Sequence, residues 1–308
     1  MFALSGCTAT NEADRISAGT KQVCSQYVTG ENADQIKVST DMSKAPTVSF
    51  PTPINSTKIE TKIVVEGTGT KFVGNQSVAL EYSGFNGATG KKFLASNYDG
   101  SNTTAEFLKK GGLPDFCSAL AGVREGSRVA LLFPAKFAHN NAGVEASGVG
   151  KNDAIIFVFD IKSVSLAQAV GDSQLPQAGF PTVTLSPTGT PGLTFPKTAA
   201  PTEFKVSTLI KGRGAKVKKD QLATVNYTGF VWDGKTFFDS SWSSGQPAQF
   251  KLSDGQLIPG FIKALVNQTI GSQVIAIIPP ADGYGSQEQS LIPANSTLVF
   301  VVDILAAK

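Results

Sequence analysis

The chain has 308 residues, of which 41% are hydrophobic and 17% charged, with 31 glycines, 16 prolines and a formal net charge of +3. This length allows two globular domains, and the composition is typical of β-rich, turn-rich folds rather than of disorder or coiled coils. The lysines are dispersed, and no apolar run approaches the ~20 residues that span a bilayer, so we expect neither nucleic-acid binding nor a membrane-spanning body.

The first residues, MFALSGC, end in Leu-Ser-Gly-Cys and resemble a bacterial lipobox, the motif in which a signal peptidase cuts before a cysteine that becomes lipidated. A complete signal peptide needs a charged segment and an apolar stretch of about 7–15 residues. Only six residues precede Cys7, and none is Lys or Arg. Either the true leader is missing from this sequence or the match is due to chance. We interpret residues 1–44 as a lipobox remnant followed by a polar tether.

The remaining cysteines, Cys24 and Cys117, form a candidate disulfide. Lipidation of Cys7 would leave these two alone in an extracytoplasmic, oxidising compartment, where disulfides form. The alternative is two unrelated thiols, buried or free.

An internal repeat organises the rest of the chain. VVEGTG at 64–69 matches LIKGRG at 209–214, so that Gly67 lies 145 residues before Gly212. The same offset joins Tyr82 to Tyr227 and Phe116 to Phe261, and an offset of 143 joins Phe107 to Phe250 and Phe157 to Phe300. PTVSF at 46–50 is matched with PTVTL at 181–185, at a shorter offset. The sequence therefore predicts two copies of one domain, at 45–165 and 181–308, with a polar linker at 166–180 that contains Gly and Pro.

In the second copy, β-rich runs surround one amphipathic segment. LIPGFIKALVNQ (257–268) places Ile258, Phe261, Ile262 and Leu265 at helical spacing, and Pro259 suits the first turn of a helix. Strands are expected at 205–210, 223–232, 235–242, 248–252, 272–280 and 296–305. A long loop, 281–295, precedes the last strand. These elements predict an α+β fold in which the helix packs against an antiparallel sheet.

The residues needed for several common kinds of catalysis are absent from the sequence. His139 is the single histidine, so the second copy holds no Ser-His-Asp set, and His/Cys metal-ligand spacings are missing. GTGTKF (67–72) lacks the spacing of a phosphate-binding loop. We interpret His139 as an exposed loop residue, and we expect no metal or cofactor.

Five motifs then follow in order in the second copy: VNYTG, FDSS, LIPGF, PPADGYG and LIPANSTLVF. Together they resemble the FKBP-type (macrolide-binding) peptidyl-prolyl cis-trans isomerases over most of residues 201–308. The first copy looks like a diverged member over about 45–165. The resemblance implies two tandem FKBP-like domains, each an antiparallel half-barrel sheet wrapped around one short helix, with a proline-binding pocket between sheet and helix.

Carried over by position, the resemblance implies a set of pocket residues in the second copy. Each aromatic taken singly is explained more simply by core packing, and only their joint fit to the pattern favours a pocket. The implied catalytic residues are Tyr227, Phe238, Asp239 and Tyr284; the implied substrate-binding residues are Phe250, Leu257, Ile258, Phe261, Ile292 and Phe300.

The chemistry suits a chain without nucleophile or metal. Rotation of an X–Pro amide crosses a barrier of ~18–20 kcal/mol but makes and breaks no bond. A dry pocket disfavours the planar, more dipolar amide, and the Tyr284 hydroxyl or a backbone N–H near Ile258 could hold the substrate carbonyl. The resemblance implies the Tyr227 hydroxyl as the partner of Asp239. The alternative is a structural Asp that caps the turn together with the two serines that follow.

The two copies differ at the acid. The first copy has Leu94 at the position of Asp239, or Ala95 if the alignment slips by one. It also lacks a counterpart of the loop tyrosine, Tyr284; the matching region of the first copy lies near His139. In the second copy, Phe261 replaces a Trp common in the family, and one extra residue separates Gly234 from Asp239. We expect these changes to alter substrate preference and macrolide affinity, and we expect the first copy to fold but to be inactive.

The sequence is thus interpreted as a tandem FKBP-type isomerase, lipid-anchored at the outer face of a bacterial cell membrane, that assists the folding of exported proteins. Its expected partners are proline-containing polypeptides and macrolide inhibitors. The rival hypothesis is a chaperone or adaptor in which both copies grip apolar segments without catalysis.

Overall fold

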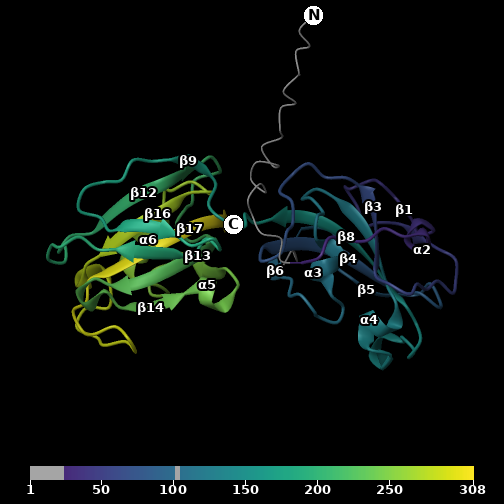
Figure 1. Cartoon of the computed structure of the whole chain (residues 1–308). Coiled ribbons are helices and arrows are strands. Elements are labelled where there is room, and N and C mark those ends of the chain that lie inside the picture. The colour runs from purple at the N-terminus through teal and green to yellow at the C-terminus, as the bar shows by residue number, and fades with distance from the viewer. Residues whose placement is uncertain (1–23, 101–104) are drawn as a thin grey trace, which may run out of the picture. The chain divides into compact units, whose positions relative to one another are not determined.

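The computed structural model describes residues 24–100 and 105–308, which form two compact units: unit 1 extends to Val164 and unit 2 begins at Ser165 (Figure 1). Both units are dominated by β-sheet, with few and short helices. Within the described ranges, no helix is long and apolar enough to cross a membrane. The predicted lipidation site, Cys7, lies outside these ranges.

Unit 1 contains a sheet in the order β3-β7-β8-β4-β5, with β6 paired to β4. A separate hairpin, β1–β2, precedes it in the chain. The elements are α2 (Glu31–Asp34), β1 (Lys37–Val38), β2 (Val48–Ser49), β3 (Glu60–Val65), β4 (Ser77–Asn86), β5 (Lys92–Ala95), β6 (Ala105–Phe107), α3 (Phe116–Leu120), β7 (Arg128–Phe133), α4 (Ala135–His139), the 3-10 helix η1 (Glu145–Ser147) and β8 (Ile155–Val164).

Unit 2 contains a sheet in the order β14-β13-β17-β16-β12-β9, with β15 paired to β13, and a separate hairpin, β10–β11. All of its strand pairs are antiparallel, and a strand overlaps each range predicted for the second copy, although in 235–242 it spans only Phe237–Ser240 and a short helix begins at Ser241. The elements are β9 (Gly171–Ser173), β10 (Thr182–Leu185), β11 (Pro191–Thr194), β12 (Lys205–Gly212), β13 (Leu222–Val231), η2 (Asp233–Lys235), β14 (Phe237–Ser240), α5 (Ser241–Ser244), β15 (Ala248–Lys251), α6 (Pro259–Leu265), β16 (Gln273–Ile278), η3 (Pro280–Asp282) and β17 (Leu298–Ala307).

Helix α6 is shorter than the predicted 257–268 because its two flanking residues are extended. Ile258 has φ −62° and ψ 139°, and Pro259 takes the first helical position, where its missing N–H costs nothing. At the other end Val266 is extended as well. Residues Phe261, Ala264 and Leu265 are buried in the core cluster that also includes residues of β16 and β17.

The two units repeat one another down to individual hydrogen bonds. Gly67 N donates to Ser127 Oγ over 2.9 Å, and 145 residues later Gly212 N donates to Ser272 Oγ over the same distance. The isolated bridge of Lys71 to Arg124 likewise recurs between residues 216 and 269. The recurrence of the same hydrogen bond and the same bridge at an offset of 145 residues indicates that the two units share one pattern of strands and turns.

The repeat also includes the hairpin, and this corrects the expected match between 46–50 and 181–185. Strand β2 pairs Val48 with Val38, and β11 pairs Leu193 with Val183, which is the same arrangement at an offset of 145. The counterpart of 46–50 is therefore 191–195. The pairing expected from sequence failed because the letters PTV occur at the start of both β2 and β10, which are not equivalent strands of the two hairpins.

Both hairpins cover an apolar face of their sheet. Phe50 meets Phe85 edge-on at 6.3 Å in unit 1, and Phe195 meets Phe230 edge-on at the same distance in unit 2. The segment predicted as a tether therefore contributes, from Cys24 on, to unit 1. Likewise the predicted linker 166–180 contains β9, which pairs with β12 and belongs by its contacts to unit 2.

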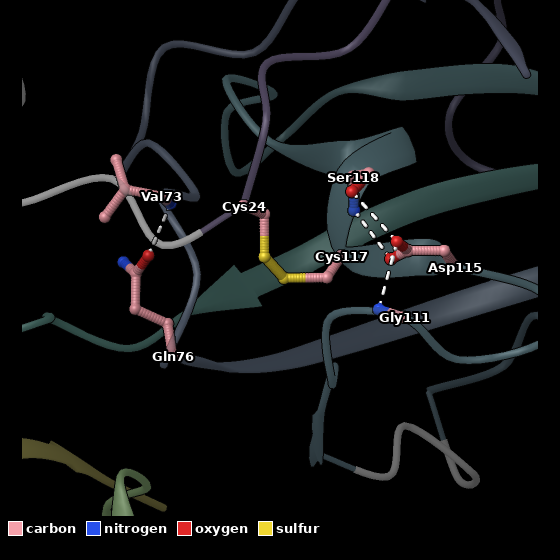
Figure 2. The surroundings of a disulfide bond; sticks show 7 residues. All are labelled: Cys24, Val73, Gln76, Gly111, Asp115, Cys117 and Ser118. Carbon is pink, nitrogen blue, oxygen red and sulfur yellow. Dashed lines mark hydrogen bonds between the residues drawn. A yellow bond between two sulfur atoms is a disulfide. The ribbon is translucent and has the colours of Figure 1, made fainter.

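The segment before the first hairpin is joined to helix α3 by a disulfide. Cys24 and Cys117 are bonded, with their Cα atoms 5.7 Å apart, and both residues are buried (Figure 2). Next to Cys117 the first turn of α3 is capped by Asp115, whose carboxylate accepts hydrogen bonds from Ser118 N and from Gly111 N (Figure 2). The structure thus pairs the two cysteines that the sequence singled out.

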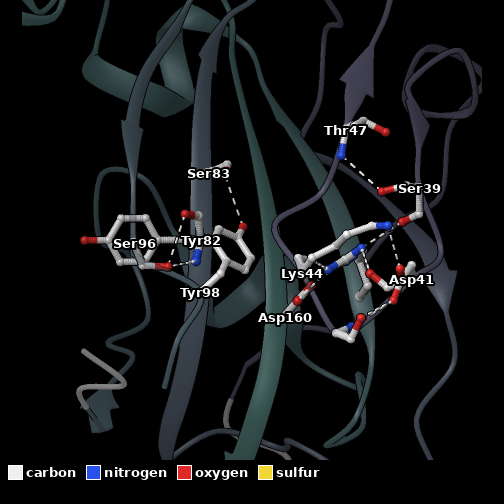
Figure 3. Close-up of polar contacts among 11 residues, drawn as sticks. Ser39, Asp41, Lys44, Thr47, Tyr82, Ser83, Ser96, Tyr98 and Asp160 are labelled. Atoms are coloured by element: carbon white, nitrogen blue, oxygen red, sulfur yellow. Dashed lines mark hydrogen bonds and ion pairs between the residues drawn. The ribbon is translucent and has the colours of Figure 1, made fainter. Parts of the chain in front are cut away.

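The buried polar group behind each hairpin differs between the units. In unit 1, Arg128 forms a bidentate pair with Asp160 at 2.5 and 2.7 Å, and its guanidinium also donates to three carbonyls of the β1–β2 loop, those of Ser39, Asp41 and Lys44. Figure 3 shows these loop residues beside Asp160. In unit 2 the corresponding residues are Gln273 and Asp303, which form a single hydrogen bond of 2.7 Å.

His139 differs from its prediction as an exposed loop residue. It is half-buried at the end of α4, where Gly143 N donates to its Nδ1 over 3.0 Å. Nδ1 is therefore an acceptor, and Nε2 carries the proton that it donates to the carbonyl of Asp153. The ring holds the α4 turn to the loop before β8.

Candidate functional site: an aromatic pocket in unit 2

The site residues come from four strands and one helix of unit 2, and from the two loops at residues 255–258 and 283–284. Tyr227 lies on β13, Asp239 on β14 and Phe300 on β17, and the register places Gly229 of the central strand opposite both Asp239 and Phe300. Gly229 is required there because a Cβ would stand 2.4 Å from the ring of Phe238 and 3.0 Å from that of Phe300. The absence of a side chain lets two rings close over the strand.

The rings meet one another mostly edge to face. Phe261, on α6, lies with its ring centroid 5.2 Å from Phe300 and 5.5 Å from Phe250, at interplanar angles of 76° and 77°. Tyr227 stands at 62° to Phe250, and Phe238 at 83° to Phe300. Edge-to-face contacts are the favoured geometry of aromatic pairs and fix each ring against its neighbours. The walls are thus well defined.

These rings enclose a cavity of about 460 Å³ that is open on one side. Of the ten predicted pocket residues nine line it, and Ile292 does not: it is 6% exposed and belongs to the core. Sequence reasoning missed four lining residues, although each is next to, or close to, a predicted one. The lining residues are Tyr227, Phe238, Asp239, Phe250, Gly255, Gln256, Leu257, Ile258, Pro259, Phe261, Gly283, Tyr284 and Phe300.

One carboxylate lies at the rim of this apolar cavity. The hydroxyl of Tyr227 donates a hydrogen bond to Oδ2 of Asp239. Burial of Tyr227, and then this bond to the carboxylate, raise the pKa of its hydroxyl well above the usual range. Tyr227 therefore remains a protonated donor at any physiological pH and holds Asp239 in place.

Tyr284 approaches the cavity from the loop after η3. It is 37% exposed, and its pKa is raised by burial first and then by the negative charge of Asp239. Its hydroxyl is thus also protonated at neutral pH and available as a donor at the pocket mouth.

The two serines after Asp239 have roles of their own. Ser240 Oγ accepts from Trp242 N at the start of α5 and lies 2.9 Å from Thr228 Oγ1. Ser241 Oγ accepts from Tyr227 N over 3.0 Å. The serines therefore cap the turn and bind β14 to β13, while the carboxylate of Asp239 is bonded to Tyr227.

Unit 1 has the same strand pairing without the acid. Leu94 stands opposite Gly84, as Asp239 stands opposite Gly229, and the register shifts at the same point in both pairs. The structure thus aligns Leu94, not Ala95, with Asp239. Leu94 is 43% exposed. As Tyr227 N donates to Ser241 in unit 2, Tyr82 N donates to the hydroxyl of Ser96 in unit 1 (Figure 3).

Comparison with known proteins gives the following relatives. The profile of the FKBP-type peptidyl-prolyl cis-trans isomerases matches residues 214–305. The probable FK506-binding protein of Corynebacterium glutamicum is 32% identical over 117 residues, which are 38% of this chain and 98% of that protein. The FKBP-type peptidyl-prolyl cis-trans isomerase FkpA of Escherichia coli is 42% identical over 97 residues, which are 32% of this chain and 35% of FkpA. The chain thus spans about a third of the length of this relative.

A crystal structure of FkpA from Escherichia coli is 35% identical, covers 43% of this chain and 53% of that chain, and superimposes with a TM-score of 0.33. The matched profile includes every residue that lines the aromatic pocket. The Corynebacterium relative is matched over nearly its whole length. The chain therefore belongs to the FKBP-type peptidyl-prolyl cis-trans isomerase family.

Proposed function

We propose that unit 2 catalyses cis–trans isomerisation of X–Pro bonds and that unit 1 does not. The observation that carries the proposal is the Tyr227–Asp239 pair at the rim of an aromatic cavity, together with Leu94 at the register position of the acid in unit 1. Each unit would be one FKBP-like domain with a half-barrel sheet around its helix.

The cavity favours the twisted amide over the planar one. The planar X–Pro amide is conjugated and dipolar, and its rotation crosses a barrier of ~18–20 kcal/mol in water. Within a cavity walled by Phe250, Phe261 and Phe300 the amide loses hydration that stabilises the dipolar form. The twisted form loses less, so the barrier falls without any covalent step.

Polar groups at the rim would hold the substrate while it rotates. The Tyr284 hydroxyl, which is protonated, can donate to a substrate carbonyl, and so can a backbone N–H near Ile258. The carboxylate of Asp239 adds a negative potential beside the twisting bond, and Tyr227 fixes its position. Proline-containing polypeptides are the proposed substrates, and macrolides the proposed inhibitors.

The setting of the reaction is proposed as well. A Cys24–Cys117 disulfide favours an oxidising, extracytoplasmic compartment. With Cys7 as a lipidation site, the protein would assist the folding of exported proteins at the outer face of a bacterial cell membrane. Unit 1, without the acid, would act as a spacer or would bind clients without turning them over.

The decisive experiment measures isomerisation of a short X–Pro peptide by exchange NMR, using the full chain and its Asp239→Leu variant. Loss of a hydrogen bond to a charged group, about 1.5 kcal/mol, lowers kcat/KM by about tenfold or more. The matched control is the exchange variant, Asp239→Leu with Leu94→Asp, which has the same composition and net charge as the parent chain. We expect it to be as impaired as Asp239→Leu.

Three results would each contradict a different part of this reasoning: the activity itself, the role of the carboxylate, or the expectation for the exchange variant. An inactive parent chain would favour the rival function, binding without catalysis. Equal activity in parent and Asp239→Leu would remove only the role of the carboxylate. Recovery of activity in the exchange variant would show that unit 1 is competent once it carries an acid.

A further inference from the structure

Unit 2 has a second cavity, of about 750 Å³, that shares no residue with the aromatic pocket. It lies between the segment 174–177, strand β12 and the turn that follows α6, and we name it the edge crevice. Its lining residues are Gln174, Leu175, Pro176, Gln177, Val206, Thr208, Lys211, Lys216, Asn267, Gln268 and Thr269.

The edge crevice lies along the half of β12 that has a strand on one side only. β16 pairs with β12 from Lys205 on, whereas β9 pairs only with residues 210–212. Among the strands that the structure describes, none pairs with residues 205–208 on the β9 side. An unpaired strand edge is a template on which an extended peptide can add a strand.

Unit 1 shows how such a crevice is filled. At the offset of 145, Val206 corresponds to Thr61 and the turn residues 266–269 correspond to 121–124. In unit 1 the extended segment Tyr27–Val28 lies there: Tyr27 N donates to the carbonyl of Ala121 over 3.1 Å, and Thr61 N donates to the carbonyl of Val28 over 2.7 Å. The ring of Tyr27 passes 3.4 Å from the place of a Cβ on Gly122.

Burial follows this difference. In unit 1, Thr61 is 1% exposed and Val123 is 2% exposed. Their counterparts in unit 2, Val206 and Gln268, are both partly exposed. The two units differ because the chain reaches unit 2 by another route: β9 pairs with residues 210–212 of β12, and none of the described strands pairs with residues 205–208 on that side.

The charge of the edge crevice indicates what it would take. Two lysines, Lys211 and Lys216, line it, and no carboxylate does. In unit 1 the counterpart of Lys211 is Glu66. The amide side chains of Asn267 and Gln268 add further donors. A negatively charged side chain is therefore the complement of this rim.

We propose that the edge crevice binds an extended polypeptide segment that adds along residues 205–208 of β12, packs an aromatic side chain on the turn 266–269, and places an acidic side chain near Lys211 and Lys216. This binding surface is separate from the isomerase pocket and does not depend on the function proposed for it. The occupant is a segment of a partner polypeptide that carries these aromatic and acidic side chains.

The probe is the peptide SQYVTGEN, which copies residues 25–32 and so includes the aromatic and acidic residues of the segment that fills unit 1. It contains no proline and is no isomerase substrate. Labelled peptide is titrated against the full chain and followed by fluorescence anisotropy. We expect saturable binding. N-methylation of the peptide at its tyrosine, which removes the donor corresponding to Tyr27 N, should weaken binding about fivefold or more.

Charge reversal at the crevice gives the second arm. The variant Lys211→Glu with Lys216→Glu should weaken binding about tenfold, whereas Lys235→Glu with Lys251→Glu, which changes net charge equally at exposed sites outside the crevice, should leave it within twofold. Hydrogen exchange with bound peptide should show protection at residues 206–208 and 266–269.

Four outcomes would overturn the proposal. The first is an absence of saturable binding, and the second is equal binding by the crevice and control variants. The third is protection around Tyr227 and Phe261, which would mean that the peptide enters the aromatic pocket. The fourth is a dimer, seen by sedimentation, that the peptide dissociates, because a second copy of this chain would then be the occupant.

Discussion

Removal of the Cys24–Cys117 disulfide should destabilise unit 1 and leave unit 2 unchanged. The bond closes a loop over a sequence separation of 93 residues. In the chain-entropy treatment, a loop of this size restricts the unfolded chain by about 4.7 kcal/mol at 25 °C. Measured effects of removing native disulfides fall at about 2–5 kcal/mol, so we expect a loss in this range for Cys24→Ala with Cys117→Ala.

The chain provides a way to separate the two units in one experiment. Its two tryptophans, Trp232 and Trp242, both belong to unit 2, so tryptophan fluorescence follows unit 2 alone. Far-UV circular dichroism follows both sheets. With an m-value of about 2 kcal/mol/M in urea, the loss should lower the dichroism midpoint of unit 1 by about 1–2.5 M, with no shift in the fluorescence midpoint.

The parent chain treated with a reductant serves as a matched control, because it loses the bond without losing either side chain. Equal shifts in the two probes would show that the units unfold together and that the bond stabilises the whole chain. A dichroism midpoint that moves by less than about 0.3 M would mean that packing of the segment around Tyr27, rather than loop closure, fixes the start of unit 1.

Two further predictions concern Asp303 and Cys7. Burial raises the pKa of Asp303 to about 6, although Gln273 and Ala169 N each donate to it. Because the folded state holds this proton more tightly than the unfolded state, the contribution of Asp303 to stability is present below pH ~4 and is lost as the pH rises through ~6. The free energy of unfolding is measured in urea by tryptophan fluorescence. Relative to the parent chain, that of Asp303→Asn should increase by about 2 kcal/mol between pH 4 and 7. A difference that does not change with pH would refute this. For Cys7, mass spectrometry of the N-terminal peptide from native cells should find a lipid-modified cysteine, and an unmodified Cys7 would end the proposal of an anchor.

Sequence patterns predicted the sheet of unit 2 and its helix closely because the hydrophobic residues of each run repeat with the spacing of either a strand or a helix, and turn residues stand at the ends of each run. Nine of the ten pocket residues were found for a related reason: their motifs stand in a fixed order along the chain. Ile292 is not among the lining residues; it is buried in the same core cluster as Phe261 and Phe300. No local pattern distinguishes an isoleucine that lines the pocket from one that packs behind it.

The parts that sequence could not predict depend on where irregular segments run. Residues 24–44 and 166–180 have similar polar composition, yet one passes over the turn after α3 and the other pairs with the far half of β12. The polar composition indicates that such a segment has few residues to bury, but it does not indicate which strand edge the segment will lie against. The hairpin match failed for the same reason, since its register depends on tertiary pairing rather than on the letters PTV.

The difference between the two copies is larger than one acid. In unit 2, Asp239 is followed by Ser240, which pairs with Thr228 across the strands. In unit 1 the same positions are Leu94, Ala95 and Ser83, and Ser83 instead bonds the hydroxyl of Tyr98 (Figure 3). The side-chain hydrogen bond between Ser240 and Thr228 is therefore absent in unit 1, although the strand pairing itself is the same. An acid placed at Leu94 would stand on a strand that lacks this hydrogen bond, and for that reason we expect the exchange of Asp239 and Leu94 not to move the activity from one unit to the other.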